Sequence, residues 1–256
     1  MIGAIAGDII GSVYEAAPIK TKTFPLFHPT SRFTDDSVLT VAVALALLKD
    51  GDYRKWVRRV GRRHPDAGYG GAFSRWLQSK DPFPYNSWGN GAAMRVSPIG
   101  FAFDNEADVL QEAKRSAQIS HDHPEGIKGA QAVALAVYLA RTTQDKNVIR
   151  NALIERFGYN MVRTTECIRP TYRCDISCQG SVPEAIIAFL DADSWEDAVR
   201  NAISLGGDSD TLACIAGAVA QAYYRQIHPS LIARVKHYLT PDLWAITRRF
   251  CETYHI

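Results

Sequence analysis

Two short stretches, far apart in the chain, place paired carboxylates beside a hydroxyl side chain directly before an apolar run. Each holds two aspartates and a threonine: Thr34, Asp35 and Asp36 in FTDDSVLT, and Asp208, Asp210 and Thr211 in LGGDSDTLAC. Carboxylate and hydroxyl oxygens are hard ligands that suit Mg²⁺, Mn²⁺ or Ca²⁺ better than zinc. The two stretches are therefore either two ordinary helix starts or two halves of one cation site.

A helix start alone explains part of this pattern. Asp, Ser and Thr are favoured N-caps, and negative charge in a first helical turn gains about 0.3–1 kcal/mol from the helix dipole. A cap needs only one acceptor, however, and adjacent carboxylates raise each other's pKa unless a cation compensates. The doubled aspartates point toward a cation site if the fold brings residue 35 close to residue 208, which spacing alone cannot establish.

The N-terminal segment MIGAIAGDIIGSVYE supplies a further carboxylate. Gly3, Gly7 and Gly11 recur every four residues and lead to Glu15, which predicts a helix face that another backbone approaches closely. With Glu15 the candidate site holds five carboxylates, a charge that two divalent cations would nearly balance, so we expect two metal ions. Asp8 precedes Glu15 by seven residues, about 10 Å along a helix axis. We therefore expect Asp8 to support the site structurally instead of sharing an ion with Glu15.

The elements that must position these residues are predicted to be helices. Few stretches alternate with period two, whereas alanine-rich apolar segments recur at Val38–Leu48, Ala130–Ala140, Val182–Leu190 and Leu212–Tyr224. The sequence SVPE predicts a helix start with Ser181 as the cap and Pro183 in the first turn, and SWED predicts another start at Ser194. No linker, low-complexity stretch or fixed-period repeat divides the chain. We therefore expect one all-α domain that covers residues 1–256.

Composition and charge exclude several classes of protein. Hydrophobic residues make up 46%, charged residues 22%, and the net charge is +2, which is typical of a globular protein without general attraction to nucleic acid or anionic membrane. No apolar run reaches about 18 residues, so no transmembrane helix is predicted. The apolar N-terminus is interrupted by Asp8 and has no preceding basic region, which argues against a signal peptide. Five cysteines are an odd number and a low density for a secreted scaffold, which favours reduced thiols and a cytoplasmic protein.

Five motifs occur in a recognisable order: GDIIGSVYE, FTDDS, NGAAMRVSPIG, SHDHPEG, and SVPEAI followed by AISLGGDSDT. Together they resemble the ADP-ribosylglycohydrolase family, which includes the dinitrogenase-reductase-activating glycohydrolase and the ADP-ribosyl-serine and ADP-ribosyl-arginine hydrolases. The similarity spans roughly residues 3 to 225. It implies an all-α orthogonal helical bundle with a binuclear Mg²⁺ (or Mn²⁺) centre at the bottom of an ADP-ribose cleft. One small departure is Ser37, where many members have threonine.

The resemblance also implies roles for individual residues. The implied metal ligands are the residues of both acidic motifs: Thr34, Asp35, Asp36, Asp208, Asp210 and Thr211. Glu15 corresponds to a glutamate after the first helix that serves some members as a ligand or a base, and we expect Glu15 and Asp36 to be the catalytic carboxylates. The implied substrate-binding residues are the loop that cradles the diphosphate and distal ribose, together with one histidine: Asn86, Ser87, Trp88, Gly89, Asn90, Gly91 and His121.

The residues of these loops also have plainer interpretations. Gly89 and Gly91 allow backbone N–H groups to approach a pyrophosphate closely, but the sequence NSWGNG is equally typical of a tight turn. Trp88 could cover a ring or simply pack against the protein. His121 could be a loop residue before a helix that starts at Pro124.

The expected activity is metal-assisted hydrolysis that releases ADP-ribose from an acceptor at the C1″ glycosidic bond. The ions would hold the 2″ and 3″ hydroxyls and orient a water, the transition state would resemble an oxocarbenium ion, and Glu15 or an aspartate of the metal shell would take the proton. The alternatives are a metal-dependent nucleotide pyrophosphohydrolase and a non-catalytic ADP-ribose-binding or crystallin-like member. We expect a monomer whose partner is ADP-ribose or an ADP-ribosylated protein side chain, small molecule or nucleic acid.

A basic segment, YRKWVRRVGRRH, lies outside these motifs. Its cations recur at helical spacing: Arg54, Lys55, Arg58, Arg59, Arg62 and Arg63. They predict one basic helix face. This face is either solvated or a docking surface for an acidic ADP-ribosylated partner.

Overall fold

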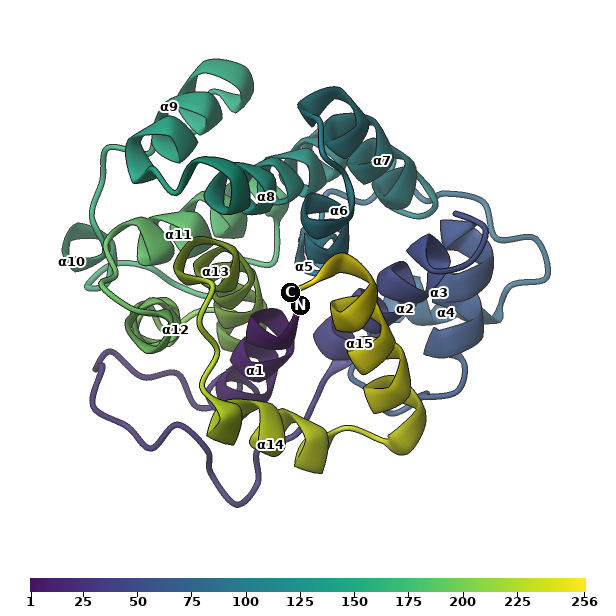
Figure 1. The fold of residues 1–256 in the computed structure, drawn as a ribbon, viewed down its shortest axis with the longest axis horizontal. Coiled ribbons are helices and arrows are strands. Elements are labelled where there is room, and N and C mark those ends of the chain that lie inside the picture. The colour runs from purple at the N-terminus through teal and green to yellow at the C-terminus, as the bar shows by residue number, and fades with distance from the viewer.

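The computed structural model describes residues 1–256 as helices joined by loops, without a β-strand (Figure 1). The helices are α1 (Ile2–Gly11), α2 (Asp35–Leu47), α3 (Tyr53–Gly61), α4 (Gly71–Gln78), α5 (Gly91–Met94), α6 (Ser97–Ala102), α7 (Glu106–Gln118), α8 (Pro124–Thr143), α9 (Lys146–Phe157), α10 (Thr165–Ile168), α11 (Cys178–Leu190), α12 (Trp195–Ser204), α13 (Ser209–Tyr224), α14 (Pro229–Tyr238) and α15 (Pro241–Tyr254). The prediction of an all-α protein is confirmed, and each predicted apolar segment lies in a helix, apart from Leu48, which caps the end of α2. None of these helices combines the length and the apolar character that crossing a membrane requires.

Helices α1 and α13 lie against each other near the centre of the molecule (Figure 1). Every residue of α1 is buried, and so is α13 from Ser209 to Ala222. A Cβ atom added to Gly7 would overlap the carbonyl oxygen of Ala213, and one added to Gly3 would overlap that of Gly217. The glycine face thus allows the close backbone approach that the sequence predicts, and this contact sets the distance between the two helices.

The predicted extension of this helix face to Glu15 is wrong. Helix α1 ends at Gly11, and the Tyr14 amide bonds to the Gly11 carbonyl three residues earlier. Glu15 follows in an exposed turn. The chain tightens into a turn here and leaves the helical path, so the position of Glu15 is set by the turn and not by the glycine stripe.

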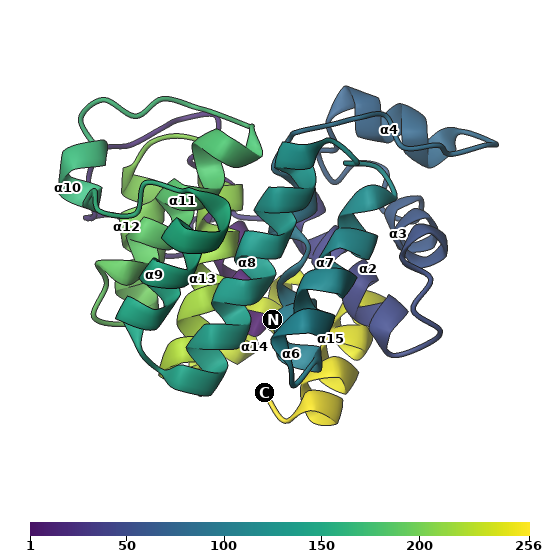
Figure 2. The same ribbon diagram turned by 90° about the horizontal axis from the view of Figure 1, so that it is seen from above.

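The remaining helices enclose this pair. The 20-residue helix α8 packs on α7 along one side and on α11 and α13 along the other (Figure 2). Helix α2 packs against α3 and α15, and α12 packs against α13. Helix α8 is buried along most of its length, so residues at its N-terminal end are held by a rigid support.

The predicted helix starts have different outcomes. Ser194 caps α12 through a bond from the Asp197 amide, as predicted. The predicted start at Ser181 is wrong, because α11 begins at Cys178 with Ser177 as its cap and carries Pro183 inside the helix. Proline removes one backbone hydrogen bond there. Helix α11 is buried from Ser181 to Leu190, and this packing outweighs the local preference.

Candidate active site

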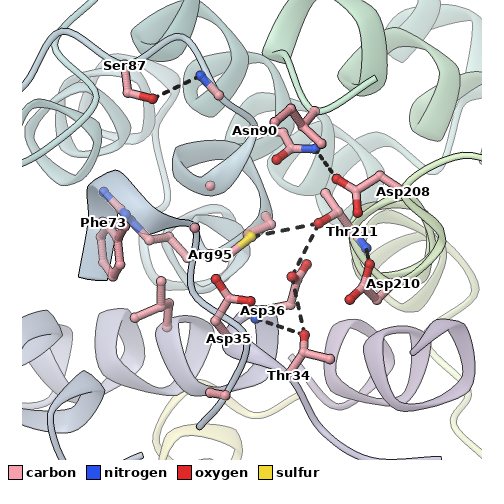
Figure 3. Close-up of a pocket in the computed structure, with 18 of the residues that line it drawn as sticks. Thr34, Asp35, Asp36, Phe73, Ser87, Asn90, Arg95, Asp208, Asp210 and Thr211 are labelled. Carbon is pink, nitrogen blue, oxygen red and sulfur yellow. Dashed lines mark hydrogen bonds between the residues drawn. The ribbon is translucent and has the colours of Figure 1, made fainter. Parts of the chain in front are cut away.

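A cavity of about 450 Å³ opens where the starts of α2 and α13 meet the loop of residues 86–91 (Figure 3). It is lined by both predicted acidic motifs, by Glu15 and by part of the predicted substrate loop: Glu15, Thr34, Asp35, Asp36, Ser87, Gly89, Asn90, Gly91, His121, Asp208, Asp210 and Thr211. The fold therefore brings residues 35 and 208 to one cleft, which spacing could not show. The roles of these residues stay predictions.

Both acidic motifs lie at helix starts, as expected if they are ordinary N-caps and also if they form a cation site. Thr34 is the N-cap of α2, and its hydroxyl accepts a hydrogen bond from the Asp36 amide at 3.3 Å. Asp208 is the N-cap position of α13, but its side chain makes no capping bond. The second motif thus leaves a carboxylate unused by the helix itself, as expected of a group that binds something else.

Asp8, on α1, holds the first motif in place through hydrogen bonds to Thr34 and Ser37. Its carboxylate accepts bonds from the Thr34 amide at 3.0 Å, the Thr34 hydroxyl at 2.7 Å and the Ser37 amide at 3.1 Å, and from the Ser37 hydroxyl. Asp8 is fully buried and does not line the cleft. These bonds join α1 to the first turn of α2, which agrees with the expected structural role of Asp8.

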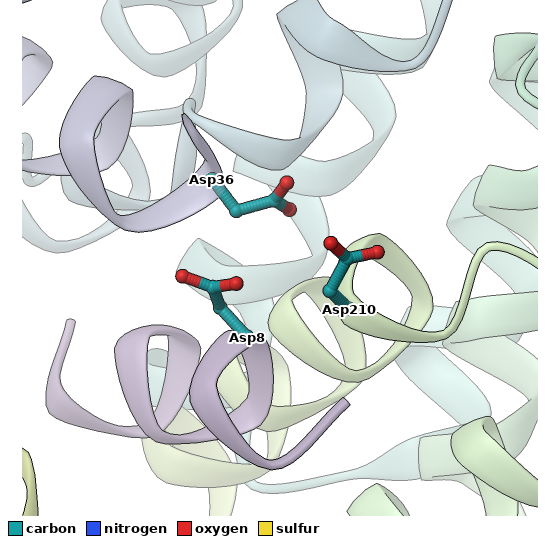
Figure 4. A group of neighbouring side chains, drawn as sticks. All are labelled: Asp8, Asp36 and Asp210. Carbon is teal, nitrogen blue, oxygen red and sulfur yellow. The ribbon is translucent and has the colours of Figure 1, made fainter. Parts of the chain in front are cut away.

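The carboxylates form two adjoining groups. Asp8, Asp36 and Asp210 point toward one another in Figure 4, and Glu15, Asp208 and Asp210 form the second group. Within each group, one oxygen of every residue lies within 4.8 Å of the others. Asp210 belongs to both groups and would link two neighbouring cation positions. Asp35 lines the same cleft but belongs to neither group.

The electrostatics of this cluster are unfavourable without a cation. Burial, followed by the charge of Asp210, raises the pKa of Asp36 well above its usual value. Burial and then Asp208 do the same to the pKa of Asp210. Burial and the charge of Asp8 raise the pKa of Asp35 to about 7. Asp36 Oδ1 is also buried without a hydrogen-bond partner, so the donor set fits hard divalent cations.

Glu15 differs from the aspartates because it lies exposed at the mouth of the cleft, as does Arg32. Partial burial and the charge of Asp208 raise the pKa of Glu15, and Arg32 opposes this shift. A carboxylate with a raised pKa beside the two carboxylate groups is suited to accept a proton.

The predicted substrate loop is held by the segment before α11. The Asn90 amide donates to the Ile176 carbonyl at 2.8 Å, and the Cys178 amide donates to the Trp88 carbonyl at 2.9 Å. The Cys178 thiol reaches the Gly89 carbonyl at 3.2 Å, and burial raises the pKa of this thiol to about 12. Cys178 is thus a neutral clamp on the loop, and no sequence signal pointed to it.

Two residues of the predicted substrate loop do not line the cleft. Asn86 has a left-handed backbone, with φ at 54°, and its backbone N–H donates to the Asp122 carboxylate at 2.7 Å. Trp88 is 52% exposed, and its ring centroid lies 5.4 Å from that of His123. The side chains of both residues therefore lie outside the wall of the cleft, although Ser87 between them lines it.

The interior wall of the cleft includes residues that the sequence did not single out. Arg95, Phe73 and Tyr85 line it, and Arg95 is fully buried. The available signal was an arginine inside the otherwise apolar stretch AAMRVSPIG. His121 is 4% exposed, and burial followed by the charge of Arg95 lowers its pKa well below the usual value.

The basic helix face has structural partners. Arg58 and Arg62 donate to the Leu77 carbonyl at the end of α4, at 3.4 and 2.6 Å. Lys55 and Arg63 lie 2.6 and 3.6 Å from aspartate oxygens. Four of the six cations therefore have a partner within the protein, and both interpretations of this face stay predictions.

Comparison with known proteins gives a consistent result. The family model described as ADP-ribosylglycohydrolase matches residues 1–255. ADP-ribosylhydrolase ARH3 of Homo sapiens is 28% identical in an alignment that covers 88% of this chain and 84% of that protein. ADP-ribosylarginine hydrolase Tri1 of Pseudomonas putida is 22% identical, with 88% and 69% covered. A solved structure described as an ADP-ribosylglycohydrolase-related protein complex has a TM-score of 0.73 and 23% identity, covers 99% of this chain and 97% of its own, and shows the same fold.

Proposed function

The chain belongs to the ADP-ribosylglycohydrolase family, and on that premise we propose that it is a Mg²⁺-dependent hydrolase that removes ADP-ribose from an acceptor by cleaving the C1″ glycosidic bond. The observation that carries this proposal is the pair of carboxylate groups sharing Asp210, placed in one cleft with the loop of residues 86–91. A sugar bound at the carboxylates could extend its diphosphate toward this loop.

The residues that would hold two Mg²⁺ ions are the cleft-lining members of the two carboxylate groups, with Asp210 between them: Asp36, Asp210, Asp208 and Glu15. Asp8 would support the first group through its bonds to Thr34 and Ser37. The Oδ1 atom of Asp36 would gain most from a bound cation, because it is buried without a hydrogen-bond partner and such burial is unfavourable. When bound, such ions supply positive charge that orients sugar hydroxyls and increases the acidity of water. Asp35, Thr34 and Thr211 are the further ligands that the family resemblance implies.

Residues of the chain would accept the proton from water and align the loop with the carboxylates. Glu15, at the mouth, would accept a proton from the attacking water, whose oxygen forms the new bond to C1″ as the bond from C1″ to the acceptor breaks. The proton held by Glu15 would then pass to the departing acceptor. Asn90 is fixed by its bond to Asp208 at 2.7 Å and would keep the loop aligned with the carboxylates. Gly91 leaves space beside His121, because a Cβ atom there would lie 3.1 Å from its Nε2 atom.

The Gly89 amide is less available to a diphosphate than the sequence suggests. It donates to the Ser87 hydroxyl at 3.2 Å within the loop itself. We therefore propose that the loop recognises a ligand mainly by its shape and by the space at Gly91, with the Gly89 amide serving to hold the turn.

The test is a panel of ADP-ribosylated acceptors incubated with the protein and Mg²⁺, with Mn²⁺, and with a chelator. The panel holds ADP-ribosyl-arginine, ADP-ribosyl-serine peptide, O-acetyl-ADP-ribose and an ADP-ribosylated oligonucleotide. We expect free ADP-ribose from at least one acceptor, only when a divalent cation is present. AMP with ribose phosphate as products would instead establish the pyrophosphohydrolase alternative.

The control for this panel is the Asp35→Asn/Asp36→Asn double variant, which changes two carboxylates to neutral groups of the same size. We expect it to lose both Mg²⁺ binding and product release. If the unaltered protein binds ADP-ribose but releases no product from any acceptor, the non-catalytic alternative replaces the proposed hydrolase.

A further inference from the structure

Three side chains at the wall of the cleft, Arg95, Ser120 and His121, form a continuous hydrogen-bonded chain. Arg95 Nη2 donates to Ser120 Oγ at 3.0 Å, and Ser120 Oγ lies 2.8 Å from His121 Nδ1. Arg95 and Ser120 are fully buried, and His121 is 4% exposed. The chain is thus shielded from bulk water, so the hydrogens in it must be arranged among these groups.

The direction of the chain follows from the first donor. A guanidinium group can only donate, so Ser120 Oγ is the acceptor in its bond with Arg95. The serine hydroxyl then has its own hydrogen to place, and His121 Nδ1 is the acceptor within reach. A hydrogen on Nδ1 would leave the buried serine hydrogen without an acceptor, which is unfavourable.

We propose that Ser120 holds His121 as the neutral tautomer with its hydrogen on Nε2, so that His121 presents a fixed N–H donor to an oxygen atom of the bound ligand. The assignment of the tautomer rests on this chain's hydrogen bonds alone. The assignment of a ligand oxygen as the acceptor rests on the proposed function.

The position of the other ring nitrogen supports this role. His121 lines the cleft, and its Nε2 atom lies beside the loop, 3.1 Å from the place where a Cβ atom of Gly91 would stand and 3.8 Å from that of Gly89. An N–H at this point can donate to a hydroxyl or phosphate oxygen. The other tautomer would present a lone pair and would repel a phosphate oxygen, which can only accept.

Burial, followed by the charge of Arg95, lowers the pKa of His121, so Arg95 favours the neutral imidazole as well as setting the direction of the bonds. Arg95 is itself held by a second bond from Nη2 to the Ser116 carbonyl at 3.0 Å and lies 5.8 Å above the Phe73 ring. Ser120 therefore acts as a positioning residue, while His121 is the group that would touch the ligand.

The experiment reads the tautomer directly by long-range ¹H–¹⁵N NMR of the histidine rings in the full-length protein. His121→Gln identifies the signals of His121 among the seven histidines. The decisive variant is Ser120→Ala, and Ser120→Thr restores a hydroxyl at the same place. The matched control is Ser116→Ala, because Ser116 is equally buried but its hydroxyl has no partner and only its carbonyl contacts Arg95.

We expect the unaltered protein to show an unprotonated Nδ1 and a protonated Nε2 near pH 7. Ser120→Ala should introduce the other tautomer, Ser120→Thr should restore the first, and Ser116→Ala should leave it unchanged. With Mg²⁺ present, Ser120→Ala should weaken ADP-ribose binding about tenfold, the effect of one misaligned hydrogen bond, whereas Ser116→Ala should not.

A proton on Nδ1 in the unaltered protein, two ring protons near pH 7, or an unchanged tautomer in Ser120→Ala would overturn the proposal. An equal response of Ser116→Ala would also overturn it, since general packing would then be the cause. These spectra need no ligand, so they are independent of the proposed function. Failure of the unaltered protein to bind ADP-ribose would refute that function and leave the tautomer result standing.

Discussion

The side-chain amide of Asn90 donates a hydrogen bond to the carboxylate of Asp208, with 2.7 Å between Nδ2 and Oδ2 (Figure 3). The two residues are 118 positions apart in the chain. This bond connects the loop of residues 86–91 to the first turn of α13 and is buried. A displacement of the loop would therefore also displace one carboxylate of the proposed metal site.

Replacing Asn90 by alanine should uncouple the loop from α13. Asp208 would lose a buried charge-assisted bond, so we expect a loss of about 1.5–3 kcal/mol in the free energy of unfolding and a fall of about tenfold or more in kcat/KM. Denaturant unfolding and steady-state kinetics measure the two effects. The control is Asn86→Gly, since Asn86 does not line the cleft and has a left-handed backbone that glycine adopts readily. Equal losses in both variants would contradict the coupling.

The variant Asp36→Asn should lose Mg²⁺ binding without a loss of stability in the metal-free protein. Burial and the charge of Asp210 raise the pKa of Asp36 well above its usual value, so removal of its charge should not lower the melting temperature of the metal-free protein. Mg²⁺ should no longer raise that temperature. Thermal melts with Mg²⁺ and with a chelator test this, with Asp104→Asn as the control because the Asp104 side chain is 93% exposed. A full Mg²⁺ response in Asp36→Asn would remove this residue from the site.

The stability of the metal-free protein should fall as the pH rises. Burial raises the pKa of Asp8 to about 6, and burial with the charge of Asp8 raises that of Asp35 to about 7, both from 3.8. Between the unfolded value of 3.8 and the raised values of about 6 and 7, the folded state therefore binds more protons than the unfolded state. The stabilisation that comes from these protons is complete below about pH 4 and is lost as the pH rises through about 7.

Mg²⁺ should act in the opposite direction across the same pH range, because the ligands must be deprotonated to bind it. The increase in melting temperature on adding Mg²⁺ should therefore be small at low pH and larger at neutral pH and above. Melts at a series of pH values, each with and without Mg²⁺, give this difference directly. A Mg²⁺ effect that does not change with pH would show that these carboxylates are not the ligands.

The variant Gly7→Ala should separate α1 from α13. The added Cβ atom would overlap the backbone of Ala213, and such overpacking costs about 1–3 kcal/mol of unfolding free energy or more. Gly70→Ala is the matched control, since a Cβ atom there meets nothing within 4 Å and φ is −56°. Urea unfolding compares the two. Similar stability of both variants would mean that the helices can move apart freely.

The variant Glu15→Gln should lose activity without losing stability. Glu15 is exposed in a turn, so its packing contributes little, whereas loss of a proton acceptor lowers kcat by about 10²–10⁴-fold. The readouts are kcat on the best acceptor of the panel and the melting temperature, with the 63%-exposed Glu252 as Glu252→Gln for comparison. An unchanged kcat would assign the proton to an aspartate of the cluster.

The sequence by itself determined the helical class and the chemistry of the two acidic motifs. The apolar segments that became α2, α8, α11 and α13 are recognisable because burial requires a local pattern of apolar residues. The caps at Thr34 and Ser194 are recognisable because a cap bonds to an amide within its own first turn. Where a local signal competed with packing, as at Pro183, the prediction failed.

Tertiary structure alone decided how these parts combine. Asp210 joins two carboxylate groups, Cys178 clamps the loop through Gly89, and Ser120 connects Arg95 to His121. Except for the step from Ser120 to His121 and the neighbours Asp208 and Asp210, these contacts join residues far apart in the chain, and no spacing encodes their distance or direction. The glycines permit the close approach of α1 and α13, and the bonds from Asp8 tie α1 to the first turn of α2. These two contacts together are the physical reason that the two motifs meet in one cleft.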